Sequence, residues 1–290
     1  MNSLKQSILA LSTLHIEQGT VYDEEGNVFD AQAYSKFKYG DAREAERYGI
    51  KLAQEFIKQN QDIFLGEDHE TNFIIAEHPR KYILKGANVI SRHFQNYLNL
   101  YLVSNGKNPI MSVPIFMSSV FEGDYGTFDK VIRDKVMSKQ QFFTSTELFQ
   151  NKHIILVDDI RITGTGERKI ASFLEELNPE SVHFLYVAKL NQNQADSNPE
   201  IESLINHVWM NDPERLIEIM NTDYFALNAR VAKHVLTLNG QTLVQFLSKI
   251  TDTRIKELYF AVISDGYSVL SKYGQSYGLL EYEFNKLFRN

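Results

Sequence analysis

Hydrophobic and polar positions follow two alternating patterns through the first two thirds of the chain. Short apolar runs typical of buried strands occur at residues 71–76, 110–116, 154–157 and 182–190. Helical spacing of apolar side chains occurs between them, over about residues 42–56, 87–101 and 170–177. Because strands that alternate with helices favour a parallel sheet with right-handed crossovers, we predict an α/β fold.

The pattern changes near residue 194. Residues 191–199 are polar and lack periodicity, which is typical of a linker, and the positions after them have helical spacing throughout. We therefore predict an α/β domain over residues 1–194 and a helical domain over residues 195–290. At the other end of the chain, residues 16–31 predict a β-hairpin with its turn at residues 23–27.

One segment combines several features of a ligand site. Asp158 and Asp159 directly follow the apolar run 154–157, and a Thr/Gly-rich turn then leads into a helix. Ligands of open α/β sheets bind at the carboxyl ends of strands. Exposed N–H groups at a helix start suit a phosphate, whereas carboxylates suit sugar hydroxyls or magnesium. The segment predicts a site for a phosphorylated sugar. The turn consists of Ile162, Thr163, Gly164, Thr165 and Gly166.

Two further polar segments lie between predicted elements. The loop 78–86 carries the cations Arg80, Lys81 and Lys85 just before a helix, where they would favour a diphosphate. A solvated basic loop has the same composition, so that interpretation stays open. The stretch 121–141 is long for a simple connection, and both a mobile lid and a surface excursion fit it.

Composition narrows the class of protein. A formal net charge of -7 argues against bulk nucleic-acid binding, and the absence of cysteine excludes disulfides and thiol catalysis. No apolar run reaches the roughly 20 residues of a membrane helix. The apolar stretch 8–14 is not followed by a cleavage site typical of a signal peptide. We expect a cytoplasmic protein with a small-molecule substrate and no nucleic-acid or membrane partner.

Residues 154–166 resemble the signature of the type I phosphoribosyltransferases, which is a hydrophobic strand, two acids and a Thr/Gly-rich phosphate loop. The order of elements over about 34–190 agrees with that fold, whereas the signature does not cover the helical tail. Residues 34–41 also resemble a bacterial subgroup encoded with tellurite-resistance and stress genes. The resemblance implies a phosphoribosyltransferase-like α/β core with an additional C-terminal helical domain.

The resemblance also implies roles for single residues. Asp158 and Asp159 would hold the ribose hydroxyls of phosphoribosyl pyrophosphate, and would bind Mg²⁺ indirectly through those hydroxyls or water. The turn 162–166 would hold the 5-phosphate. The pyrophosphate loop would consist of Arg80, Lys81, Lys85 and Gly86. Two positions depart from the family pattern. Ile162 stands where some purine-salvage members have an aspartate base, and Gly166 stands where a second hydroxyl residue is usual.

The function implied is that of a magnesium-dependent pentosyltransferase, which transfers the phosphoribosyl group to an unidentified acceptor and releases pyrophosphate. The two departures keep a second interpretation open, a regulatory protein that binds phosphoribosyl pyrophosphate or a nucleotide without turnover. A third is a relative that uses the site in reverse, as a nucleotide phosphorylase or a pyrophosphatase-like enzyme. A homodimer would be usual for such a protein, but the sequence leaves the oligomeric state open.

Overall fold

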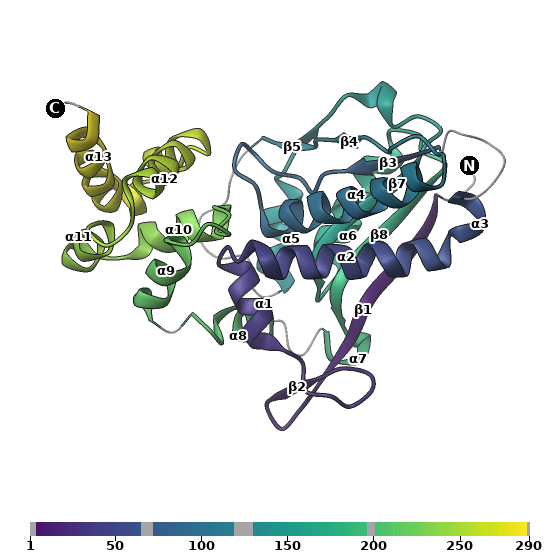
Figure 1. Ribbon diagram of the computed structural model, residues 1–290, viewed down its shortest axis with the longest axis horizontal. Helices are drawn as coiled ribbons and strands as arrows, with labels where there is room; N and C mark the ends of the chain where they lie inside the picture. Colours follow the sequence, from purple (N-terminus) through teal and green to yellow (C-terminus); the bar gives the residue numbers. More distant parts are fainter. Residues whose placement is uncertain (1–3, 65–71, 119–129, 196–200, 211, 289–290) are drawn as a thin grey trace.

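The computed structural model describes residues 4–64, 72–118, 130–195, 201–210 and 212–288. Its centre is a six-stranded sheet with the strand order β2-β1-β8-β7-β3-β4 (Figure 1). All neighbours pair in parallel except β2, which is antiparallel to β1. The six strands are β1 (Lys5–Glu17), β2 (Thr20–Tyr22), β3 (Phe73–Ala76), β4 (Ser112–Val113), β7 (His153–Arg161) and β8 (Ser181–Leu190). A separate two-stranded sheet joins β5 (Phe116–Met117) to β6 (Phe142–Phe143).

Helices cover both faces of the large sheet. Those of the first two thirds of the chain are α1 (Ala31–Lys38), α2 (Ala42–Gln59), α3 (Gln61–Phe64), α4 (Gly86–Ser104), α5 (Lys130–Ser138) and α6 (Thr165–Glu175). A short 3-10 turn, η2 (Thr146–Leu148), precedes β7. Alternate residues of β7 point to opposite faces, because side chains of a strand have a period of two. Ile155 and Val157 belong to the core that contains α2 and α4, whereas Ile154 and Leu156 belong to the core that contains α6.

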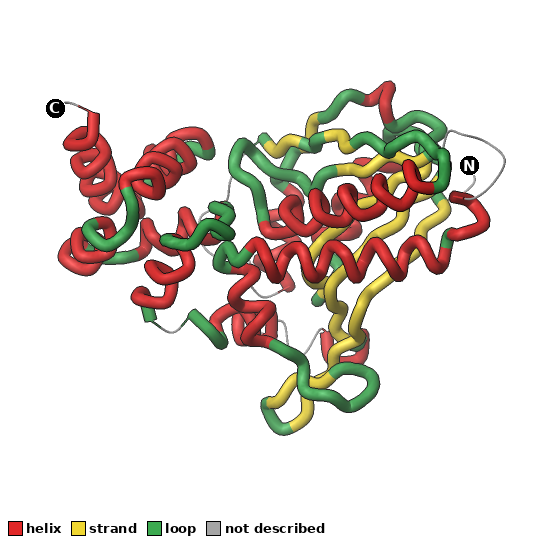
Figure 2. Tube along the Cα trace, viewed as in Figure 1, coloured by secondary structure: helices red, strands yellow, loops and turns green. Residues whose placement is uncertain are grey.

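The remaining chain is helical, as the tube in Figure 2 shows. Its elements are α7 (Gln192–Ala195), α8 (Ile201–His207), α9 (Pro213–Met220), α10 (Ala229–Thr237), α11 (Gly240–Leu247), α12 (Asp252–Ser264), η3 (Tyr267–Val269), η4 (Ser271–Tyr273) and α13 (Gly274–Phe288). Helices α9 to α13 share a hydrophobic core of their own, which also takes in Tyr39 and Ile83 from the α/β part. Helix α8 instead packs against α1, and its Ile201 and Ile205 join the core of the sheet.

The structure confirms the predicted fold class, a mixed α/β core with a mostly parallel sheet and additional C-terminal helices. The division into domains at residue 194 stays a prediction, although the hydrophobic cores change farther along the chain, between Ile205 and Met210. Within the described ranges, none of the helices combines the length and the apolar character needed to span a bilayer.

Two predicted strand regions are corrected. The main N-terminal hairpin turns at Gln18 and Gly19, both with positive φ, and the predicted turn at residues 23–27 closes only a single bridge beyond it. The strand predicted over 110–116 is split into β4 and β5, with Pro114 between them. Proline has no N–H group to donate to a neighbouring strand, so a sheet strand does not continue through it.

Candidate functional site

A cavity of about 420 Å³ lies at the carboxyl end of β7, between the sheet and the helical region. Asp158, Asp159 and the turn 162–166 line it from the α/β side. Asn228, which directly precedes α10, lines it from the helical side together with Arg230 and other residues of α10 and η4. The C-terminal region therefore contributes to the site directly.

The turn after β7 combines a glycine of positive φ with two hydroxyls at a helix start. Gly164 has a φ of 69° and directly precedes α6, and a Cβ there would lie 3.0 Å from the guanidinium of Arg161. Only glycine adopts this conformation without strain, which explains its place in the turn. The Thr163 hydroxyl donates to the Thr165 hydroxyl over 3.2 Å, so both hydroxyls lie on the same side of the turn. Hydroxyls and N–H groups at a helix start together suit a phosphate.

The described part of the segment predicted as a lid contacts this turn. Residues 119–129 lie outside the described residues, and the segment continues as the helix α5. The Thr165 hydroxyl donates to Oδ1 of Asp134 on α5 over 2.9 Å. A carboxylate of the protein itself thus contacts a hydroxyl that would otherwise donate to a phosphate. Whether α5 moves as a lid stays a prediction.

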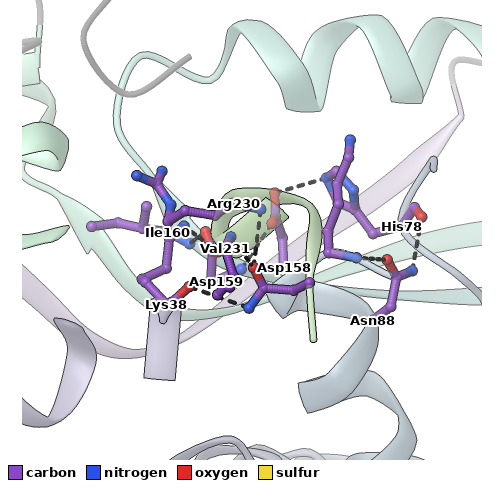
Figure 3. Close-up of polar contacts among 10 residues, drawn as sticks. Lys38, His78, Asn88, Asp158, Asp159, Ile160, Arg230 and Val231 are labelled. Carbon is purple, nitrogen blue, oxygen red and sulfur yellow. Dashed lines mark hydrogen bonds and ion pairs between the residues drawn. The ribbon is translucent and has the colours of Figure 1, made fainter. Parts of the chain in front are cut away.

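The two acids at the end of β7 each contact a basic side chain from elsewhere in the chain (Figure 3). Lys38 Nζ lies 2.5 Å from Asp159 Oδ2, and His78 Nε2 lies 3.3 Å from Asp158 Oδ2. Backbone N–H groups fix the other oxygens, because Asp159 N donates to Asp158 Oδ1 and Ile160 N to Asp159 Oδ1. Both carboxylates line the cavity despite these partners, so a ligand hydroxyl can reach them.

The charges around Asp158 favour its ionised form. Burial alone would raise the pKa of this carboxyl, but the charge and the hydrogen bond of His78, the N–H of Asp159 and the charge of Lys38 outweigh burial. The pKa of Asp158 is consequently lowered. The site keeps an anion where a sugar hydroxyl would need an acceptor.

Lys85 is the cation of the 78–86 loop that lines the cavity, together with Gly86. Burial lowers the pKa of Lys85 to about 8, while the charges of Asp158 and Asp159 oppose that decrease. Its Nζ lies 3.4 Å from Sδ of Met117. A buried ammonium of this kind gains strongly from a bound anion, because the anion offsets the cost of desolvation.

Arg80 and Lys81, predicted beside Lys85, do not line the cavity. The Arg80 guanidinium pairs with Glu77 over 3.1 Å, and Lys81 Nζ donates to the backbone carbonyl of Asp265 over 3.0 Å. The structure thus brings Lys85 and Gly86 to the acids and the turn 162–166, and places the charged groups of Arg80 and Lys81 elsewhere.

Several cavity residues were not among the predicted site residues. Lys38 and Tyr39 come from the end of α1, and both lie in the segment 34–41 that carries the finer resemblance. His78 lies in the loop 78–86, which also carries Arg80, Lys81 and Lys85. Asn228 and Arg230 follow no pattern in the sequence that points to this cavity.

The side chains around the cavity determine how a Mg²⁺ ion could bind there. Within the described ranges, His, Asp and Glu side chains form no group of three that could hold a metal ion. Mg²⁺ commonly binds through one or two carboxylates plus substrate oxygens and water. Asp158 and Asp159 fit that indirect mode, and they do not fit a dedicated protein cage.

No curated protein sequence is significantly similar to this chain. Two crystal structures of a hypoxanthine phosphoribosyltransferase from Staphylococcus aureus align with it, in a tetragonal and an orthorhombic form. They are 16% and 13% identical, cover 52% and 50% of this chain and 67% and 75% of their own, and have TM-scores of 0.33 and 0.31. At these values they say nothing about the substrate of this chain.

A family model gives a more extensive match. The model described as PRTase ComF-like, where PRTase denotes phosphoribosyltransferase, matches residues 10–280. The matched range includes the strand β7 with its two acids, the turn 162–166 and most of the helical region. The chain therefore belongs to the PRTase ComF-like family.

Proposed function

We propose that the protein binds phosphoribosyl pyrophosphate and transfers its phosphoribosyl group to an acceptor, with release of pyrophosphate. The observation that carries the proposal is one cavity that combines an acid pair, a Thr/Gly turn at a helix start and the buried Lys85. These three features match the three parts of the substrate, which are ribose hydroxyls, a 5-phosphate and a diphosphate. Membership of the PRTase ComF-like family supports the same reaction class.

The residues suggest how the reaction would proceed. Asp158 and Asp159 would accept hydrogen bonds from the ribose hydroxyls, and the turn 163–166 would hold the 5-phosphate, so C1 is fixed between them. The bond from C1 to the diphosphate oxygen breaks, its electron pair leaves with the diphosphate, and positive charge develops on the sugar. The acceptor supplies the electron pair of the new bond to C1 and loses its proton.

Lys85 would stabilise the leaving group. Negative charge builds up on the diphosphate as the bond breaks, and a preorganised ammonium in a buried site stabilises that charge more than water does. Ile162 is an apolar, buried side chain and cannot take the proton of the acceptor. That proton would leave to water or to the diphosphate.

Mg²⁺ would be held at Asp158 and Asp159 through ribose hydroxyls and water, and would supply further charge neutralisation for the diphosphate. Because Asp159 already pairs with Lys38, the protein supplies part of the positive charge itself. We expect magnesium to strengthen binding of the diphosphate substrate more than binding of ribose 5-phosphate, which lacks that group.

The regulatory interpretation has specific support. Asp159 lies in an ion pair with Lys38, and Thr165 contacts Asp134, so both halves of the site have internal partners. In a sensor, the bound ligand would replace these internal partners, and the protein would then release the ligand without breaking any of its bonds. Pyrophosphate release in the presence of candidate acceptors separates an enzyme from such a sensor.

A double variant, Asp158→Asn with Asp159→Asn, tests the site. We expect its affinity for ribose 5-phosphate in calorimetry to fall at least about tenfold, because hydrogen bonds to charged groups contribute about 1.5–3 kcal/mol each. Asp252→Asn on α12, an exposed acid outside the cavity, is the matched control and should bind as wild type does. Circular dichroism checks that each variant is folded. Wild-type affinity in a folded double variant would show that the acids do not bind the sugar.

A further inference from the structure

The two edges of the large sheet are protected differently. β4 ends the sheet on one side with only two residues, and Pro114 follows it directly. β2 ends it on the other side, but it pairs only with residues 15–17 of β1. The rest of β1, a strand of 13 residues, therefore lies at the edge beside β8 (Figure 1). Proteins commonly limit such an edge by shortness, proline or charge, because its unpaired N–H and C=O groups can pair with another chain.

Alternate residues of β1 direct their backbone groups towards β8 and away from it. The carbonyl of Leu14 accepts from the N–H of Asn191, which directly follows β8. The N–H of Ile16 likewise donates to the side chain of Gln194. The even-numbered residues thus face β8, and the odd-numbered residues face the outer edge.

Most of the outward groups lack a hydrogen-bond partner. The N–H of Thr13 donates to the carboxylate of Glu24. Within the described ranges, no hydrogen bond reaches the outward N–H and C=O groups of the odd-numbered residues before Thr13, which are Lys5, Ser7, Leu9 and Leu11. Residues 5–11 are called the edge segment below.

The edge segment lacks the usual protection. Lys5 is its only charged residue, and it contains neither proline nor glycine. The side chain of Ile8 is exposed at 44%. Leu9 lies in the core that contains α2 and α4, so these helices cover a face of β1 rather than its edge. An uncharged, apolar edge of this kind favours pairing with a further strand.

The unpaired groups are arranged symmetrically about Ile8. If two copies of the edge segment pair antiparallel around a two-fold axis at Ile8, Lys5 of one copy lies opposite Leu11 of the other. Ser7 then lies opposite Leu9, and each of these pairs exchanges two backbone hydrogen bonds. Every outward backbone group of the edge segment gains a partner in this register.

Side chains favour the same register. The two copies of Ile8 form a pair without backbone hydrogen bonds, in which the Cα atoms lie about 4.5 Å apart and the side chains cover each other. A register centred on Leu9 would instead place Lys5 opposite Thr13, whose N–H already donates to Glu24. A strand of another protein would meet the same backbone groups, but the symmetry about Ile8 specifically favours a second copy of this chain.

We propose that the edge segment is a homodimer interface, through which two copies of the chain join their sheets into one continuous sheet. The two-fold axis gives the closed symmetry that is commonest among homo-oligomers. None of the described residues that line the cavity belongs to β1, so the interface leaves the proposed site open.

Disulfide cross-linking tests the register, because the chain has no cysteine of its own. In Ile8→Cys the introduced thiols meet at the axis, within the Cα separation of about 4.4–6.8 Å that a disulfide requires. Mild oxidation should therefore convert most of the protein into covalent dimers. Gln6→Cys is the matched control. Residue 6 lies opposite Ala10 in this register, so its two thiols would be four positions, or roughly 13 Å, apart and should not cross-link.

Sedimentation velocity tests the interface itself. We expect wild type to sediment as a dimer. Ile8→Lys places two ammonium groups opposite each other and removes the apolar contact, so it should raise the dissociation constant of the dimer at least about tenfold. Ile263→Lys on α12 is the matched control, because Ile263 has nearly the same exposure, 43%, and should keep the wild-type value.

Three results would overturn the proposal. Wild type could sediment as a monomer throughout the concentration range. The dimer could persist in a folded Ile8→Lys variant, which would place the interface elsewhere. Gln6→Cys could cross-link as readily as Ile8→Cys, which would exclude the register centred on Ile8. Circular dichroism checks that each variant is folded, and the cross-linking result decides the proposal if Ile8→Lys does not fold.

Discussion

Lys85 is the residue whose charge state most directly controls the proposed site. Burial lowers its pKa to about 8, so its ammonium is charged below that pH and loses its proton as the pH rises through it. A diphosphate needs the charged form. We expect the affinity for inorganic pyrophosphate, measured by calorimetry, to fall on the order of tenfold between about pH 7 and about pH 9.

A Lys85→Met variant is the control, because it keeps the length of the side chain without the charge. Its pyrophosphate affinity should be weak at all of these pH values, with only the change that the ligand's own ionisation produces. If pyrophosphate affinity changes with pH equally in Lys85→Met and in wild type, the charge of Lys85 does not bind the diphosphate.

The lowered pKa of Lys85 also affects the stability of the fold. Between about 8 and the ordinary value of 10.5 the unfolded chain binds more protons at this position, so the contribution of Lys85 to stability rises with pH.

At the residue scale, the local chemistry of the site could be read from the sequence, but its long-range partners could not. The acids and the turn 162–166 are consecutive, so one strand and one helix start determine their arrangement. Lys38 pairs with Asp159 across 121 positions of sequence, and only the fold brings them together. The cations Arg80 and Lys81 look equivalent to Lys85 in the sequence, yet their charged groups have partners outside the cavity.

At the element scale, the loop between β3 and α4 is held by the helical region. Oδ1 of Asp265 accepts from the N–H groups of Tyr82 and Ile83, over 2.8 Å and 3.0 Å. Ala229 N donates to the carbonyl of Leu84 over 3.0 Å. These contacts fix the backbone that leads to Lys85. The shape of the loop therefore depends on Asp265, which lies about 180 residues farther along the chain.

Replacing Asp265 should therefore affect a ligand that it does not touch. In Asp265→Ala both N–H groups lose their acceptor, and at about 1.5–3 kcal/mol for a hydrogen bond to a charged group we expect a destabilisation of roughly 3 kcal/mol. Denaturant unfolding measures this loss, and calorimetry should show weaker pyrophosphate binding. Asp265→Asn keeps an acceptor oxygen and should restore much of both. If Asp265→Ala is destabilised yet binds pyrophosphate as wild type does, the loop does not depend on this contact.

The helices with strong local determinants are the elements that the sequence predicts best. Helix α2 begins after Asp41, whose side chain accepts from Arg43 N, and it contains the helical spacing predicted over about residues 42–56. Strand β1 was missed apart from its end, because its residues 5–14 become a strand by pairing with β8 near the other end of the α/β region. Such pairing leaves no local pattern beyond a short apolar run.

At the scale of the whole molecule, the two regions share their interior. Tyr39 and Ile83 of the α/β part lie in the core of α9 to α13, while Ile201 and Ile205 lie in the core of the sheet. A change in composition marks the linker in the sequence, but it cannot show which core a helix joins after that linker. Helix α8 joins the first core, because α1 presents an apolar face to it.

Two truncated chains test where the sheet's core ends. A chain ending at residue 208 keeps Ile201 and Ile205 against α1, whereas a chain ending at residue 194 loses both. Since burial of one such side chain contributes about 1.5–3 kcal/mol, we expect the shorter chain to unfold with a free energy at least about 3 kcal/mol lower. Equal stability in denaturant would instead place the boundary at residue 194. Neither chain contains Asn228 or Asp265, so neither should bind pyrophosphate as the full chain does, and a binding-competent fragment would show that the helical region is not part of the site.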